Sequence, residues 1–213
     1  MKLFRWAIVV VGLLSATASL AAEGKETLIS IQIMNGTADL YSPNGADYIS
    51  AYEHSENGLG VQFWRLMSKD YAFNFTLGIG GFSETDSPGP GAPVGATDAV
   101  YSQSSWTLRL GGDRAVKIGD RAIVYFGPGI EFWSGSATFE GGPGGPGVNF
   151  ETDDVGRVSL AGRVGGVMML NEKLGFNIEV GRYIGRATAE EGGAEAKWWP
   201  SGFQAAGGLT IRL

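Results

Sequence analysis

Hydrophobic and polar residues alternate along most of the chain beyond residue 22. The stretch LGFNIEVGRYIG (174–185) shows the pattern in its simplest form, with Leu174, Phe176, Ile178 and Val180 alternating with Gly175, Asn177, Glu179 and Gly181. A period of two residues predicts a β-strand with one apolar and one polar face. The direction of the apolar face then decides the class of protein: inward in a soluble barrel or sandwich, outward in a membrane barrel.

Eight segments alternate in this way, and no long stretch has the 3.6-residue period of a helix. The segments lie near residues 25–36, 57–67, 71–82, 100–112, 121–135, 155–169, 173–185 and 200–213. Most contain the roughly 9–11 residues that a tilted strand needs to cross a bilayer. The pattern predicts an all-β chain.

The connections between these segments alternate strictly in length. Residues 68–70 and 171–173 are short connections, and 113–120 is of modest length. The other connections, 37–56, 83–99, 137–154 and 187–199, are long and rich in glycine, proline and acidic residues. An up-and-down meander places all short turns at one end, as in outer-membrane barrels with short periplasmic turns and longer extracellular loops. We expect the glycine- and proline-rich stretches to be mobile.

The polar faces carry small or neutral residues with isolated charges. These charges are Arg109, Glu131, Arg163, Glu179 and Arg212. A face exposed to water would be rich in Lys and Glu, whereas the interior of an eight-stranded barrel is just filled by side chains and requires buried charges to be paired. We therefore expect an eight-stranded antiparallel up-and-down transmembrane β-barrel with a plugged, charge-paired lumen. A narrow gated channel, opened by exchange of ion-pair partners, is an alternative.

Aromatic residues lie toward both ends of the expected strands. We expect Tyr71, Tyr125 and Phe176 near the short connections, and Tyr101, Trp133, Tyr183, Trp198 and Trp199 near the long ones. Two girdles of this kind are typical of membrane barrels, because amphipathic rings favour the membrane–water interfaces.

The first 22 residues have the features of a secretory signal peptide. Lys2 and Arg5 precede an apolar run from Trp6 to Leu14, and small residues follow, with cleavage expected after Ala21 or Ala22. Residues 23–213 then form the barrel domain. The apolar run is shorter than the ~20 residues of a membrane-spanning helix.

Composition narrows the class of protein further. The 213 residues carry a net charge of −6 and contain 35 glycines and no cysteine. The absence of cysteine excludes disulfides, thiol nucleophiles and cysteine metal sites, and the absence of a basic patch argues against nucleic-acid binding. No cofactor or metal is expected.

The chain resembles the small eight-stranded outer-membrane barrel proteins, which include the membrane domain of outer-membrane protein A, outer-membrane protein X and the opacity proteins. The resemblance is carried by the eight-strand rhythm, by GRVSLAGRVGGVMML (156–170) and by the last strand, GFQAAGGLTIRL (202–213). It implies a monomer in the outer membrane of a diderm bacterium, in contact with lipid and lipopolysaccharide and inserted by the barrel-assembly machinery. That machinery usually reads a terminal aromatic residue, where this chain has Leu213. The resemblance also implies roles in envelope integrity, adhesion or surface interaction.

One short motif raises the alternative of catalysis. His54, the one histidine of the chain, lies beside Ser55 and Glu56 in AYEHSENG (51–58), and some barrels of this class remove acyl chains from lipid A with His, Ser and Glu. Those enzymes use a His-x-Ser arrangement, whereas adjacent strand residues point to opposite faces. We therefore expect a non-enzymatic protein, with a lipid A acyl hydrolase as the alternative. A soluble lipocalin-like barrel with apolar faces turned inward is a third possibility.

Overall fold

The computed structural model describes residues 26–39, 53–86, 99–140, 149–191 and 194–213. The expected signal peptide, residues 1–22, lies outside these ranges. The strands are β1 (Thr27–Asp39), β2 (Glu53–Leu66), β3 (Tyr71–Asp86), β4 (Ala99–Ile118), β5 (Ala122–Glu140), β6 (Asn149–Met169), β7 (Leu174–Glu191), β8 (Ala194–Trp198) and β9 (Ser201–Arg212). No helix in the described part of the chain is long and apolar enough to cross a membrane.

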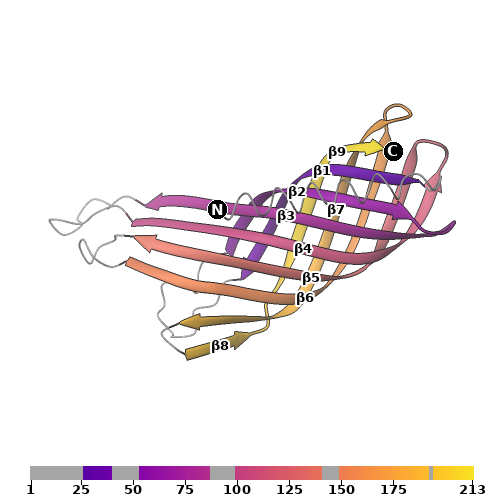
Figure 1. The fold of residues 1–213 in the computed structure, drawn as a ribbon. Helices are drawn as coiled ribbons and strands as arrows, with labels where there is room; N and C mark the ends of the chain where they lie inside the picture. Colours follow the sequence, from indigo (N-terminus) through magenta and orange to yellow (C-terminus); the bar gives the residue numbers. More distant parts are fainter. Residues whose placement is uncertain (1–25, 40–52, 87–98, 141–148, 192–193) are drawn as a thin grey trace.

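The strands form one closed antiparallel sheet (Figure 1). Each strand from β1 to β7 pairs with the next, and β9 pairs with both β7 and β1. Strands β8 and β9 act as one wall strand, because Ala187↔Trp198 and Ile184↔Ser201 belong to the same register on β7. Pro200 separates them, since proline has no N–H for the ladder. The prediction of an eight-stranded up-and-down barrel is confirmed.

The register around the barrel fixes its tilt and width. Register partners followed once around the sheet run from Ile211 through Ile29, Phe63, Phe75, Leu110, Ile130, Leu160 and Ile184 to Ser201, ten residues away from the start on the same strand. A stagger of ten over eight strands corresponds to a strand tilt of about 40° and a backbone radius of about 8 Å. Long side chains from opposite walls therefore meet inside the lumen.

One end of the barrel, the turn end, contains the short turns at 67–70, 119–121 and 170–173, the start of β1 and the end of β9. The opposite end is the distal end. At the turn end, β4 extends to Ile118, so residues 113–118 form strand and the sequence-based connection 113–120 is wrong. The chain reverses at Gly119, whose φ of 64° favours glycine. At the distal end, β7 and β8 occupy most of the expected connection 187–199.

The outer face of the barrel is apolar. Its exposed large hydrophobic side chains include Ile31, Ile33, Leu59, Phe73, Ile79, Ile130, Val158, Leu160, Val164, Phe176, Ile178, Val180, Ile184, Leu209 and Ile211. Leu160 is 67% exposed and Ile178 is 65% exposed, which is far from the pattern of a soluble surface. We call this surface the apolar belt. The apolar faces therefore point outward, and the lipocalin-like alternative is wrong.

A charge placed in the middle of the apolar belt tests this orientation. We expect Ile178→Arg to lower the free energy of unfolding in lipid vesicles by about 2–4 kcal/mol, because an arginine at the bilayer midplane of a barrel costs that much. Denaturant titration of the refolded protein measures the effect.

Thr188→Arg is the matched control, because Thr188 lies on the same outward face of β7, ten residues nearer the distal end. The expected loss there is below about 1 kcal/mol. Equal losses at both positions would contradict an apolar belt centred near Ile178.

Candidate functional site: the charged lumen

Six charged side chains meet in the middle of the lumen. Arg109 and Asp113 come from β4, Glu131 from β5, Arg157 and Arg163 from β6, and Glu179 from β7. All six are at most 7% exposed. They form an alternating chain, Arg157–Glu131–Arg109–Glu179–Arg163–Asp113, in which every neighbouring pair is a salt bridge. We call this set the lumen charge chain, and its three positive and three negative charges balance.

Arg109 lies at the centre of the lumen charge chain and contacts both neighbouring carboxylates. Its Nη1 donates to Glu179 Oε1 at 2.7 Å, and its Nη2 donates to Glu131 Oε2 at 3.0 Å. Gln204 of β9 accepts from Arg109 and donates its own Nε2 to Glu131 Oε1 at 3.0 Å. The Gln204 side-chain amide thus stabilises the Arg109–Glu131 pair from the opposite wall of the barrel.

Glu179 connects the two halves of the chain. Its Oε2 accepts from Arg163 Nη1 at 2.6 Å, from Gln62 Nε2 at 2.9 Å and from Tyr125 Oη at 3.1 Å. With Arg109 on its other oxygen, this carboxylate has four partners from β2, β4, β5 and β6. A buried carboxylate is tolerated when paired and hydrogen-bonded in this way.

The two ends of the lumen charge chain rest on aromatic rings. Toward the turn end, Asp113 binds Arg163 and accepts from Trp64 Nε1 and Asn74 Nδ2, both at 3.0 Å. Toward the distal end, the Arg157 guanidinium lies 3.9 Å from the Tyr183 ring centroid and 5.2 Å from that of Trp133. Within the described residues Arg157 has one carboxylate partner, Glu131, and cation–π contacts of this kind add to its stabilisation.

An apolar layer lies in the lumen toward the turn end. It consists of the buried residues Leu28, Trp64, Ala72, Ala115, Ile123, Tyr125, Val167 and Met169, with Leu66 packed against them. The Tyr125 ring lies over Gly165 of β6, where a Cβ would come 2.5 Å from the ring carbon Cζ. Glycine at that position makes room for the ring.

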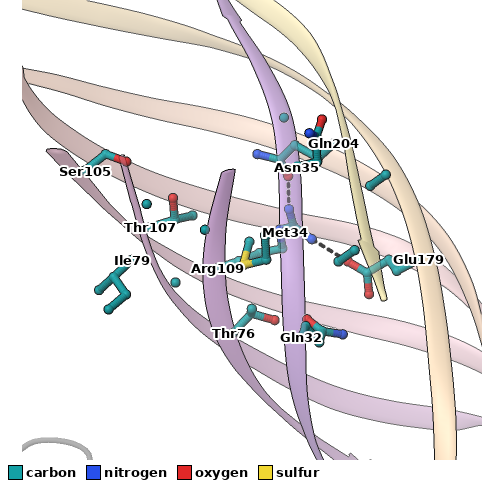
Figure 2. Close-up of a pocket in the computed structure, with 16 residues that line it drawn as sticks. Gln32, Met34, Asn35, Thr76, Ile79, Ser105, Thr107, Arg109, Glu179 and Gln204 are labelled. Atoms are coloured by element: carbon teal, nitrogen blue, oxygen red, sulfur yellow. Dashed lines mark hydrogen bonds and ion pairs between the residues drawn. The ribbon is translucent and has the colours of Figure 1, made fainter. Parts of the chain in front are cut away.

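A small cavity lies on the other side of the lumen charge chain (Figure 2). It is lined by polar side chains including Gln32, Thr76, Thr107, Arg109 and Glu179, and by several glycines of β1, β2 and β3. Its volume of about 40 Å³ holds roughly three or four water molecules at ~10–15 Å³ each. Thr76 Oγ1 is buried at this cavity without a protein partner in the described part of the chain, which is consistent with a water site.

The structure brings together Arg109, Glu131, Arg163 and Glu179 from the set that the sequence singled out. Arg212 lies apart, at the turn end, where it binds Glu26 at 2.9 Å. Asp113 and Arg157 join the charge chain although the sequence analysis did not select them. The alternation along β6 could have predicted Arg157, because it lies an even number of residues from Ser159, Ala161 and Arg163 and so faces the same side. Asp113 was missed because it lies in the stretch 113–120, which the sequence pattern predicted to be a connection.

Three of the eight expected girdle residues face the lumen instead of lipid. Tyr125, Trp133 and Tyr183 are each at most 4% exposed. On β5, Tyr125 and Trp133 lie an even number of residues from the lumen-facing Glu131. On β7, Tyr183 lies an even number of residues from Glu179. Because side chains alternate between the two faces of a strand, all three rings point inward. Tyr71, Phe176 and Trp199 are exposed, and the side chains of Tyr101 and Trp198 lie outside the described part.

The catalytic candidates His54, Ser55 and Glu56 belong to β2, where their backbones pair with residues 36–38 of β1. Consecutive positions of an extended strand alternate between its two faces, and the side chains of these three residues lie outside the described part. Within that part, no group of three or more His, Asp or Glu residues could hold a metal ion.

Removing the carboxylate that connects the two halves tests the energetic role of the lumen charge chain. We expect Glu179→Gln to lower the free energy of unfolding by about 3–5 kcal/mol, because Arg109 and Arg163 would share an uncompensated buried charge. Glu172→Gln, in an exposed turn, removes the same charge and is expected to change stability by less than about 0.5 kcal/mol. Equal denaturant midpoints for the two variants would refute the role of Glu179.

Comparison with known proteins places the fold. No protein-family model and no curated protein sequence matches the chain. The outer membrane protein OprG from Pseudomonas aeruginosa aligns over 89% of this chain and 96% of its own, with 14% identity and a TM-score of 0.52. A major outer membrane protein from Thermus thermophilus (13% identity, 88% and 99% coverage, TM-score 0.49) and Neisserial surface protein A (9%, 89% and 97%, 0.45) are also similar. The chain has the fold of the small eight-stranded outer-membrane β-barrels.

Proposed function

We propose that this protein is a non-enzymatic β-barrel of the bacterial outer membrane that presents its distal connections at the cell surface and conducts no solutes. The observation that carries the proposal is the arrangement of side chains in the lumen: the charge chain runs from Asp113 to Arg157, and the apolar layer around Trp64 lies next to it. Eight strands leave an interior that side chains can fill. Charge-paired side chains from β4 to β7 occupy the middle of this interior, which supports a closed lumen.

The apolar belt supports the membrane location. A barrel that exposes large hydrophobic residues on every wall strand requires lipid as its solvent, and a closed sheet satisfies its backbone hydrogen bonds there. Removal of residues 1–22 as an export signal, followed by insertion by the assembly machinery, would bring it to the outer membrane. Each strand of the ring formed by β1 to β7 and β9 pairs with a neighbour on both sides, which supports a monomer.

The lengths of the strands support surface display. Strands β4, β5 and β6 contain 20, 19 and 21 residues, whereas about 9–11 tilted residues cross a bilayer. The short turns, the start of β1 and the end of β9 all lie at the turn end, which is periplasmic in barrels of this architecture. The excess strand length then extends beyond the outer leaflet and holds the distal connections away from the membrane.

Heat modifiability tests the membrane barrel directly. Outer-membrane fractions of expressing cells are run on a denaturing gel with and without boiling. We expect the unboiled band to migrate faster than the boiled one, because the closed hydrogen-bonded sheet stays folded in detergent until it is heated. The protein is expected to be absent from the soluble fraction. A soluble band that ignores heating would refute the proposal.

Planar-bilayer recording tests the closed lumen. We expect the wild-type protein, purified and inserted in a bilayer between 1 M KCl solutions, to show no conductance steps above the empty bilayer. The physical reason is the apolar layer, because ions cannot cross a dry lumen segment without losing their hydration. Reproducible conductance steps would favour the gated-channel alternative. The lipid A acyl pattern of cells with and without the gene tests the hydrolase alternative.

A further inference from the structure

Two arginines interrupt the apolar belt on one side of the barrel. On the outward face of β7, Val180 is followed by Arg182, Ile184 and Arg186 at alternate positions. Both arginine side chains are exposed. They lie toward the distal edge of the belt, since Arg186 comes after Ile184, the last exposed large hydrophobic residue of β7.

Aromatic and basic residues of the neighbouring wall strand surround these two arginines. The Arg182 guanidinium lies 5.2 Å from the ring centroid of Phe203, its register partner on β9. Trp199, which is 74% exposed, and the exposed Lys197 lie further along the same wall strand. We call Arg182, Arg186, Lys197, Trp199 and Phe203 the basic patch. A cation next to an interfacial aromatic ring is the typical arrangement at the headgroup level of a membrane.

The described outward positions of β4 and β5 near the distal edge of the belt carry no charge. At the corresponding outward positions of β4 and β5 the residues are Ser104 and Ser136, which pair with each other. Along the outward face of β7 from Ile178 to Thr188 there is no acidic residue, and the pair Glu190↔Glu195 lies further from the belt. The net positive charge of the patch therefore faces the zone where lipid headgroups lie.

We propose that the basic patch binds the phosphate of an anionic membrane-lipid headgroup, with Arg182 and Arg186 as the phosphate ligands. Guanidinium groups form paired charge-assisted hydrogen bonds with phosphate oxygens. Arginine side chains at the edge of an apolar surface extend toward the headgroups, which brings both guanidinium groups to the phosphate level. The adjoining apolar belt would hold the acyl chains of the same lipid. This inference rests on the proposed membrane location.

The test titrates dioleoylphosphatidylglycerol into the full chain, refolded in a neutral maltoside detergent, and follows the unfolding temperature. A lipid that binds the folded state raises this temperature with its concentration. We expect the double variant Arg182→Gln/Arg186→Gln to require at least about tenfold more lipid for the same rise, since charge-assisted hydrogen bonds are lost. The double variant Arg121→Gln/Lys173→Gln removes the same charge from exposed positions at the turn end and is expected to respond like the wild type.

Each outcome has a defined meaning. An unchanged lipid response of Arg182→Gln/Arg186→Gln, or an equal loss in the turn-end control, would overturn the patch as the binding site. An equal response to inorganic phosphate at the same concentration would overturn the assignment to a lipid. The heat-shifted band of each variant shows that the barrel is folded, so failure of lipid binding is distinguishable from failure of the membrane-barrel proposal.

Discussion

Closure of the sheet at eight strands is the constraint on which the rest of the structure depends. Every residue of a closed sheet faces either the outside or an interior of about 8 Å backbone radius, and the two-residue period assigns it to one of them. Side chains at outward positions can be large and apolar, because the solvent there is lipid and no opposite wall restricts their size. Inward positions must share a narrow volume, so their size and charge have to be balanced across strands that are far apart in sequence.

The lumen charge chain is the electrostatic consequence of that closure. An arginine in a dry interior loses its hydration, which costs more than a single partner returns unless the geometry is complete. Arg109 meets this requirement with two carboxylates and Gln204, and Arg163 meets it with Asp113 and Glu179. The lumen charge chain thereby connects β4, β5, β6 and β7 with β9 through polar contacts across the lumen, in addition to the backbone ladders that connect neighbouring strands.

The sequence predicted the parts of this structure that depend on local period. The direction of the apolar faces, the eight-strand count and the inward placement of Arg109, Glu131, Arg163 and Glu179 all follow from alternation within a strand. The ion-pair partners cannot be predicted from this alternation, because Arg109 meets Glu179 only after the sheet has closed with a stagger of ten residues. Tyr125 and Trp133 were predicted at the membrane interface for a different reason. The preference of aromatic residues for interfaces was given more weight than their even spacing from Glu131, which turns them into the lumen.

The two sides of the lumen are built from residues of different size, and this asymmetry explains where space remains. In the distal half of the lumen, the bulky inward residues Trp133, Arg157 and Tyr183 come from β5, β6 and β7, whereas Gly58, Gly60, Gly78 and Gly80 occupy inward positions of β2 and β3. The small cavity lies on the glycine side, lined by Gln32 and Thr76. Toward the turn end on that side, the apolar layer that includes Leu28, Trp64 and Ala72 lies in the lumen. Charge pairing on one wall and apolar packing at one end are therefore two separate supports for the proposed closure of the lumen.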